Sequence, residues 1–327
     1  MALLGAAATF PSHALSQRSG PEASRVRRIG VLTTPAENDP LYKPRAAAMV
    51  EGLAALGWKA GDNLRVEWRY SGGDQVLLAR YADELVALAP DALLAVGSPC
   101  VEVLRRRTRT IPIVFTIVTD PLGQGFVDSL SRPGGNIAGF TDFDLSMSLK
   151  WLQMLTEIAP PVATVGVLYN PATAPIADRM LQVVGEAASS RGVMARAKPV
   201  CDEAGIEAAA AALSREPRAG LLVLPNTFTI VNRAAIVRAA ERARLPAVYW
   251  NRAFVMEGGL MSYGTDNNDL HRRSADYLAR ILNGADPGTL PVQYPTKFDL
   301  VINLKTAKTL GVEVAPALLA AVDEVIE

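Results

Sequence analysis

The stretch Leu93–Arg107 reads LLAVGSPCVEVLRRR, and its middle marks a change of local structure. The apolar run Leu93–Val96 predicts a buried strand, and Gly97 predicts a tight turn at the end of that strand. Ser98 is a favoured N-cap, and Pro99 is favoured as the first residue of a helix. We therefore expect a strand, a turn and a helix start with free backbone N–H groups.

The alternation of strand and helix continues on both sides of this stretch, and it restarts after a break near Asp142–Ser146. Strands that alternate with helices indicate parallel sheets covered on both faces. Because the series runs twice, the predicted fold class is α/β, with two doubly wound parallel-sheet lobes. The apolar runs that best predict buried strands are 27–34, 91–97, 111–118, 163–170 and 219–226.

The bulk composition narrows the class of protein. The 327 residues include 33 basic and 33 acidic ones, so the formal net charge is zero. Nucleic-acid-binding proteins usually carry a basic excess, and this balance argues against that class. Half of the residues are hydrophobic and a fifth are charged, which indicates folded cores rather than disorder. The length predicts about two domains.

Residue types used in catalysis or metal binding are scarce. Cys100 and Cys201 are too far apart for a metal motif or a disulfide framework. Cys100 falls near the predicted helix N-terminus, which would lower the pKa of its thiol. His13 lies near the start of the chain, and His271 lies in a helix that looks exposed. No dinucleotide, hydrolase or nucleotide motif follows a strand, so we expect no catalytic residue, metal or cofactor.

The first 26 residues resemble a secretory leader. Ala2–Phe10 is apolar and small, and residues 12–14 and 14–16 match the small-x-small cleavage pattern. The basic front is missing, so either translation starts upstream or the leader is vestigial. No later segment approaches the ~20 apolar residues of a membrane span. We expect a soluble chain exported to the periplasm, with a mature start within 17–25.

Ligands of open parallel sheets bind beyond the carboxyl ends of the strands. The residues that follow each predicted strand are therefore the candidate binding residues. They carry hydroxyl, amide, aromatic and carboxylate groups, a mixture that suits a small polar or amphipathic molecule. These candidates are Thr33, Thr34, Ser98, Pro99, Thr119, Asp120, Phe140, Asp142, Asn170, Asn226, Thr227, Trp250, Asn251 and Tyr263.

Each candidate also has a purely structural interpretation. The hydroxyl of Ser98 and the nearby free N–H groups suit a ligand carboxylate, or Ser98 only caps its own helix. Asp120 and Asp142 suit a ligand ammonium, or they are turn and cap residues. Trp250 and Tyr263 would line the cleft beside an apolar part of the ligand, or they belong to the core of a lobe.

Two long blocks carry a family resemblance. Segment 114–141 reads VFTIVTDPLGQGFVDSLSRPGGNIAGFT, and segment 245–312 begins LPAVYWNRAFVMEGGLMSYGTDNN. Both resemble the substrate-binding proteins of ABC transporters of the tryptophan/tyrosine-uptake type. The likeness covers nearly everything from Arg27 to Glu327. Ser98 stands where many members have threonine, and this exchange keeps the hydroxyl.

The resemblance implies a type I periplasmic-binding-protein fold, in which two lobes joined by three crossovers close over a ligand at the hinge. By this analogy, lobe one comprises residues 27–142 and 266–292. Lobe two comprises residues 143–265 and 293–327, and residues 1–26 are the leader. The return of the helix near residues 270–283 to lobe one comes from the resemblance alone.

The resemblance also implies a function. The chain would be a monomeric receptor that captures a solute between its lobes and delivers it to an ABC permease in the inner membrane. The leading ligand class is an amino acid, aromatic or other. Ser98 would take its carboxylate and Asp120 or Asp142 its ammonium, while the aromatic candidates would face its side chain.

Two other functions stay open at the level of the sequence. An exported subunit that reports ligand occupancy to a membrane kinase or chemoreceptor would have the same pocket and a different docking partner. A carboxylate-dependent enzyme on this scaffold is the third alternative, although no motif points to one.

Overall fold

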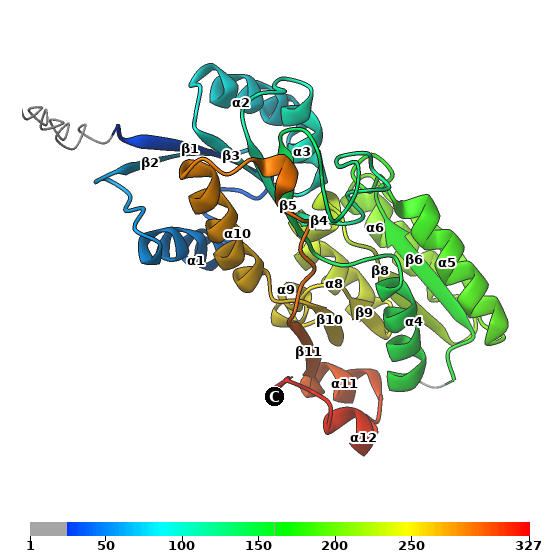
Figure 1. Cartoon of the computed structure of the whole chain (residues 1–327). Coiled ribbons are helices and arrows are strands. Elements are labelled where there is room, and N and C mark those ends of the chain that lie inside the picture. Colours follow the sequence, from blue (N-terminus) through cyan, green and yellow to red (C-terminus); the bar gives the residue numbers. More distant parts are fainter. Residues whose placement is uncertain (1–24, 160) are drawn as a thin grey trace, which may run out of the picture.

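The computed structural model describes residues 25–159 and 161–327, and the chain forms two lobes, each built on one sheet (Figure 1). Residues 1–24 of the predicted leader, with His13, lie outside the described residues. None of the helices in the described part of the chain is long and apolar enough to cross a membrane.

The first lobe contains a five-stranded parallel sheet in the order β2-β1-β3-β4-β5. The inner strands are buried on both faces, because helices cover the sheet from both sides. The strands are β1 (Arg27–Thr33), β2 (Leu64–Tyr70), β3 (Ala92–Val96), β4 (Ile113–Val118) and β5 (Ile137–Thr141). The helices between them are α1 (Tyr42–Ala55), α2 (Gln75–Ala87) and α3 (Ser98–Arg105).

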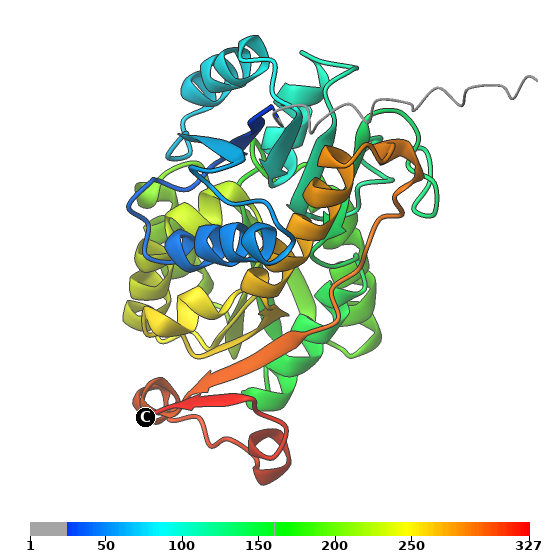
Figure 2. The same cartoon turned by 60° about the vertical axis from the view of Figure 1, so that its left-hand side comes forward.

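A helix from far along the chain completes this lobe. Helix α10 (Asn267–Leu282) packs beside α1 on one face of the first sheet, as Figure 2 shows. Its residues Leu270 and Leu278 share a core with Ile29 and Met49. The short 3-10 helix η1 (Pro287–Thr289) follows it. These cores support our proposal that lobe one comprises 27–142 with 266–292 and lobe two comprises the remaining described residues.

The second lobe contains a seven-stranded sheet in the order β12-β11-β10-β9-β8-β6-β7. β10 and β11 pair antiparallel, while the other neighbours run parallel. Its strands are β6 (Thr164–Tyr169), β7 (Met194–Pro199), β8 (Ala219–Val223), β9 (Ala247–Tyr249), β10 (Met261–Thr265), β11 (Phe298–Asn303) and β12 (Glu324–Ile326). Its helices are α4 (Met147–Ile158), α5 (Ala177–Ser190), α6 (Glu203–Leu213), α7 (Thr227–Val231), α8 (Arg233–Arg242), α9 (Arg252–Met256), α11 (Leu304–Leu310) and α12 (Pro316–Leu319).

Three crossover segments join the lobes: β5 to α4, β10 to α10, and η1 to β11. The first and third lie side by side. The backbone N–H of Thr141 donates to the carbonyl of Gln293 at 3.0 Å, and the N–H of Gln293 donates to the carbonyl of Gly139 at 3.0 Å. Two α/β lobes of this kind confirm the predicted fold class.

The structure corrects two expectations about single residues. His271 is fully buried rather than exposed, and its ring lies edge-on to Tyr42 with 5.8 Å between centroids. Burial lowers the pKa of His271 to about 3, so the ring is neutral near pH 7. Cys100 is buried, and burial raises its pKa instead of lowering it. Cys201 is an exposed free thiol.

Gly139 gives a test of the packing between β4 and β5, next to the first crossover. A methyl group at this position would lie 2.6 Å from the backbone nitrogen of Phe115 and closer still to its carbonyl oxygen. We expect Gly139→Ala to lower the free energy of unfolding by about 2 kcal/mol or more, because the strand backbone must move. Urea unfolding followed by circular dichroism measures the change.

Gly185 in α5 is the matched control, because a methyl group built there has no heavy atom within 4 Å apart from the adjoining residues and the helix's own backbone. Gly185→Ala should stabilise the protein by about 0.5–1 kcal/mol through helix propensity. Equal effects of the two substitutions would contradict the assigned packing of Gly139.

Candidate functional site

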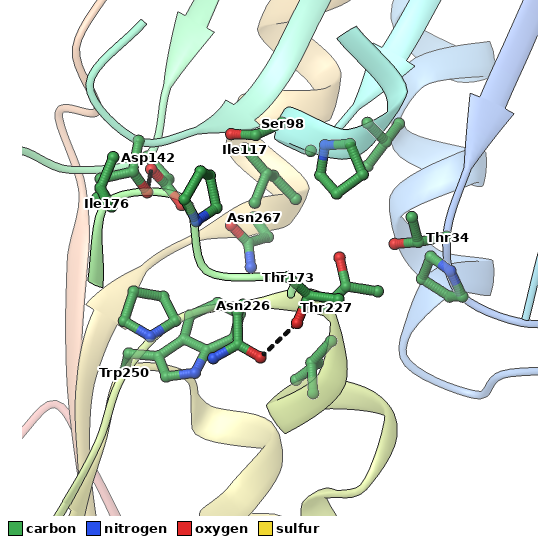
Figure 3. A pocket seen from close by; sticks show the side chains of 18 of the residues that line it. Thr34, Ser98, Ile117, Asp142, Thr173, Ile176, Asn226, Thr227, Trp250 and Asn267 are labelled. Atoms are coloured by element: carbon green, nitrogen blue, oxygen red, sulfur yellow. Dashed lines mark hydrogen bonds between the residues drawn. The ribbon is translucent and has the colours of Figure 1, made fainter. Parts of the chain in front are cut away.

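A cavity of about 90 Å³ lies between the lobes, at the carboxyl ends of the strands of both sheets (Figure 3). In each sheet the strand order reverses here, around β1 and β3 in the first and β6 and β8 in the second. Such switch points are where open α/β sheets bind ligands. The lining residues are Thr34, Pro35, Arg45, Val96, Gly97, Ser98, Pro99, Ile117, Thr119, Gln124, Asp142, Thr173, Pro175, Ile176, Pro225, Asn226, Thr227, Ile230, Trp250 and Asn267.

The structure brings together eight of the fourteen residues predicted from the sequence. Lobe one and the first crossover supply most of them, and lobe two supplies an amide, a hydroxyl and an indole ring across the cavity (Figure 3). These eight are Thr34, Ser98, Pro99, Thr119, Asp142, Asn226, Thr227 and Trp250.

The other six candidates do not line this cavity. Thr33 is buried at the end of β1. Phe140 packs against Tyr277 with 4.7 Å between ring centroids, and Tyr263 stacks on Phe298 at 5.7 Å. Both rings therefore pack against other rings within the protein. This agrees with the interpretation of aromatic residues at strand ends as core residues rather than ligand contacts.

The remaining three make local or cross-lobe contacts. The side-chain oxygen of Asn170 accepts from the N–H groups of Ala172 and Thr173, and it shapes the turn after β6. Asn251 is the N-cap of α9. Asp120 accepts from the N–H of Gly123 and pairs with an arginine of lobe two, as described below.

The helix start at Ser98 differs from its prediction. Gly97 is the N-cap, with a φ of 88° that glycine adopts without strain, and Ser98 is the first helical residue. The N–H of Cys100 already donates to the carbonyl of Gly97 at 3.1 Å, and Pro99 has no N–H. The first turn of α3 therefore offers the single N–H of Ser98 to the cavity, rather than several.

The Ser98 hydroxyl belongs to a row of polar side chains along the ends of β3, β4 and β5. Its oxygen accepts from Nε2 of Gln124 at 2.9 Å, and the same nitrogen donates to the carbonyl of Thr119. Within the described chain, no acceptor takes the hydroxyl hydrogen of Ser98. This hydrogen is available to a bound acceptor in the cavity.

Asp142 ends this row, on the first crossover. It is only 3 % exposed, and its carboxyl oxygen accepts from Oγ1 of Thr119 and from the N–H of Phe143, each at 2.9 Å. Burial raises the pKa of Asp142 to about 7. None of the described cationic side chains lies within ion-pair distance of it. The cavity thus contains a buried carboxyl group that lacks a counter-ion.

Arg45, on α1, lines the cavity and is not among the residues predicted from the sequence. The side chain is half-buried, and burial lowers its pKa to about 10. The guanidinium has no hydrogen bond or ion pair to the residues that the structure describes. The sequence does contain one signal for this position. Arg45 falls three residues after Tyr42 and four before Met49, so helical spacing places a charged residue on the apolar face of the helix.

Ile117 is a second missed residue, and its backbone is unusual. Its φ is 57°, a strained conformation for a β-branched residue, and the register of β4 on β5 shifts between Thr116 and Val118. Figure 3 shows its side chain at the upper wall of the cavity. An irregularity of this type cannot be read from an apolar run. The other missed polar residues are Gln124, Thr173 and Asn267.

Two ion pairs link the lobes beside the cavity. Asp120 after β4 pairs with Arg179 on α5, and Asp39 after β1 lies 3.4 Å from Arg233 on α8. The side chains of Asp39 and Arg233 are 15 % and 12 % exposed, so this pair is the less screened of the two. Contacts of this kind exist only when the lobes are together, so the structure represents a closed arrangement.

Comparisons with known proteins agree with this geometry. Residues 28–326 match the family described as ABC transporter substrate binding protein. The chain is 25% identical over 314 residues to the tyrosine-binding protein of Clostridioides difficile, a match that covers 95% of this chain and 88% of that one.

Two solved structures are similar over 92% of this chain. One is a conserved domain protein from Vibrio cholerae, with 29% identity, a TM-score of 0.85 and full coverage of that chain. The other is an ABC domain from Streptococcus pneumonia in complex with L-Trp, with 25% identity, a TM-score of 0.84 and 99% coverage.

The raised pKa of Asp142 predicts a pH dependence of stability. Between about pH 4 and 7, Asp142 ionises in the unfolded chain but stays protonated in the folded one, so rising pH favours unfolding. We expect Asp142→Asn to gain stability relative to wild type across this window. The gain should be on the order of 4 kcal/mol and should level off above pH 7.

Thermal unfolding at pH 4, 5.5, 7 and 8, without ligand, measures this difference. Asp144→Asn is the control for loss of one carboxylate, because Asp144 is exposed two residues away. A difference between Asp142→Asn and wild type that does not vary with pH would refute the buried, raised-pKa state.

Proposed function

Because this chain belongs to the ABC transporter substrate binding protein family, we propose that it is a receptor that captures an aromatic amino acid between its lobes. It then delivers this solute to a membrane permease. The family is one of binding proteins, so the chain performs no reaction on its ligand in this proposal. We propose that it acts as a monomer in the periplasm.

The observation that carries the proposal is the polar row Ser98–Gln124–Thr119–Asp142, which faces the cavity. At one end, the hydroxyl and N–H of Ser98 are free to donate to a carboxylate. At the other end, the buried carboxyl of Asp142 lacks a cation. An α-amino acid carries both complementary charges on one carbon, so its head group supplies what both ends lack.

The remaining wall suits an apolar side chain. Ile117 of lobe one and Ile176, Ile230 and Trp250 of lobe two line the cavity. Trp250 is 7 % exposed, so its indole ring forms a firm apolar part of the cavity wall. The tyrosine-binding relative and the L-Trp complex support an aromatic ligand over a sugar or an ion.

Closure follows from contacts that one ligand makes with both lobes. Only a ligand that binds the closed form better can shift the equilibrium towards it. Here the head group binds lobe one and the first crossover, while the side chain packs on lobe two. The ion pairs Asp120–Arg179 and Asp39–Arg233 then add cross-lobe attraction.

Ligand analogues test the role of Asp142 directly. We expect isothermal titration calorimetry to show binding of L-tyrosine at pH 8, and at least tenfold weaker binding of 3-(4-hydroxyphenyl)propanoate, which lacks the ammonium. In Asp142→Asn the two affinities should become similar, because the carboxylate that distinguishes them is gone. Asp144→Asn should keep the wild-type preference. Failure of the wild type to bind any aromatic amino acid would overturn the proposed ligand class.

The affinity for L-tyrosine should also depend on pH. Below pH 7 the carboxyl of Asp142 is protonated and cannot pair with an ammonium, so binding should weaken by up to about tenfold per pH unit. The affinity of the wild type should change little between pH 8 and 7 and fall along this slope from pH 7 to 5, while that of Asp142→Asn should stay flat across the whole range. Parallel pH profiles of the two proteins in calorimetry would remove Asp142 from the ammonium site.

A further inference from the structure

The unpartnered guanidinium of Arg45 has no role in the recognition of the head group as described. The polar row from Ser98 to Asp142 spans the ends of β3, β4 and β5. Arg45 comes from α1, which follows β1, and β1 lies three strands from β5 in the sheet order. Neighbouring strands are about 4.8 Å apart, so these two ends of the cavity are separated by roughly 14 Å of sheet.

Figure 3 shows the same layout. Thr34, which follows β1, lies on the side of α1, and Asp142 lies at the opposite side, with Ile117 between them. Arg45 also lines the adjoining cavity with Asn251 and Asn267, so it stands where the two cavities meet. A head group held at Asp142 and Ser98 would therefore direct its side chain along the row of strand ends towards Arg45.

The carboxylates near Arg45 are already engaged. Asp39 pairs with Arg233 at 3.4 Å, and Asp266 caps α10 by accepting from the N–H groups of Asn268 and Asp269. Neither lies within ion-pair distance of Arg45. A half-buried arginine without a hydrogen-bond acceptor is unfavourable in a closed cavity, and a ligand oxygen at this position would remove that cost.

We propose that Arg45 selects amino acids whose side chain ends in an oxygen acceptor, a carboxylate or a phenol hydroxyl, over those that end in hydrocarbon. This inference rests on the proposed function and adds the chemistry of the far end of the ligand. A carboxylate binds best, because its charge complements the guanidinium. A phenol oxygen accepts a weaker hydrogen bond, and a phenyl ring leaves the guanidinium without a partner.

The test is calorimetry at pH 8 with three ligands that differ only at the ring para position: L-phenylalanine, L-tyrosine and 4-carboxy-L-phenylalanine. Wild type should bind 4-carboxy-L-phenylalanine at least tenfold more tightly than L-phenylalanine, a difference of about 1.4 kcal/mol, with L-tyrosine between them. In Arg45→Met the three affinities should fall within threefold of one another, and that of L-phenylalanine should not decrease.

Arg45→Gln is a second variant in case the methionine does not fold. Arg80→Met, on the exposed face of α2, is the control for loss of one positive charge outside the cavity, and it should keep the wild-type order. Ligand-free Arg45→Met should also unfold at a temperature equal to or above that of wild type, because a desolvated cation without a partner is gone.

Each contrary outcome has a separate meaning. An order of affinities that survives Arg45→Met would overturn the selection by Arg45. An equal loss for all three ligands would overturn it too, and would assign Arg45 to the α-carboxylate instead. Failure of all three to bind wild type would overturn the proposed function together with this inference.

Discussion

A carboxyl group buried without a cation beside it is the constraint on which the site depends. Asp142 accepts from Thr119, which follows β4 of lobe one, and from the backbone N–H of Phe143, in the segment where the chain leaves lobe one. The group therefore lies at the hinge rather than on the face of one lobe. In the proposed receptor, a ligand ammonium that pairs with it would contact the part of the chain that joins the lobes, so recognition and closure would share the same few residues.

Local patterns were enough to predict the fold class. The apolar runs before Gly97 and before Asn170 became buried strands, and their alternation with helices gave one parallel sheet and one largely parallel sheet. What local patterns could not predict is non-local packing. Helix α10 lies on the first sheet because its apolar face fits beside α1, and only the family resemblance indicated this return. The antiparallel pairing of β10 with β11 likewise depends on a partner brought there by the third crossover.

The site residues that directly follow a strand were predictable from the sequence. Those that come from a helix or from irregular backbone were not. Ser98, Thr119 and Asp142 line the cavity because parallel strands end at one edge of a sheet. Arg45 comes from a helix. Ile117 lies within a strand, but its own backbone has a left-handed conformation, which no sequence pattern indicates. Phe140 and Tyr263 pack into the lobes instead. Sequence position alone does not distinguish a ring that faces a ligand from one that faces a core.

The ion pairs Asp120–Arg179 and Asp39–Arg233 join the two sides of the rim around the cavity. Each pair joins groups from separate halves of the molecule, so the rim forms one continuous surface only while the halves are together. In the proposed receptor, a partner shaped to both sides of this rim would distinguish a loaded molecule from an empty one without touching the cargo. Occupancy would thereby be displayed on the exterior, and a single docking geometry would serve every cargo that fits inside.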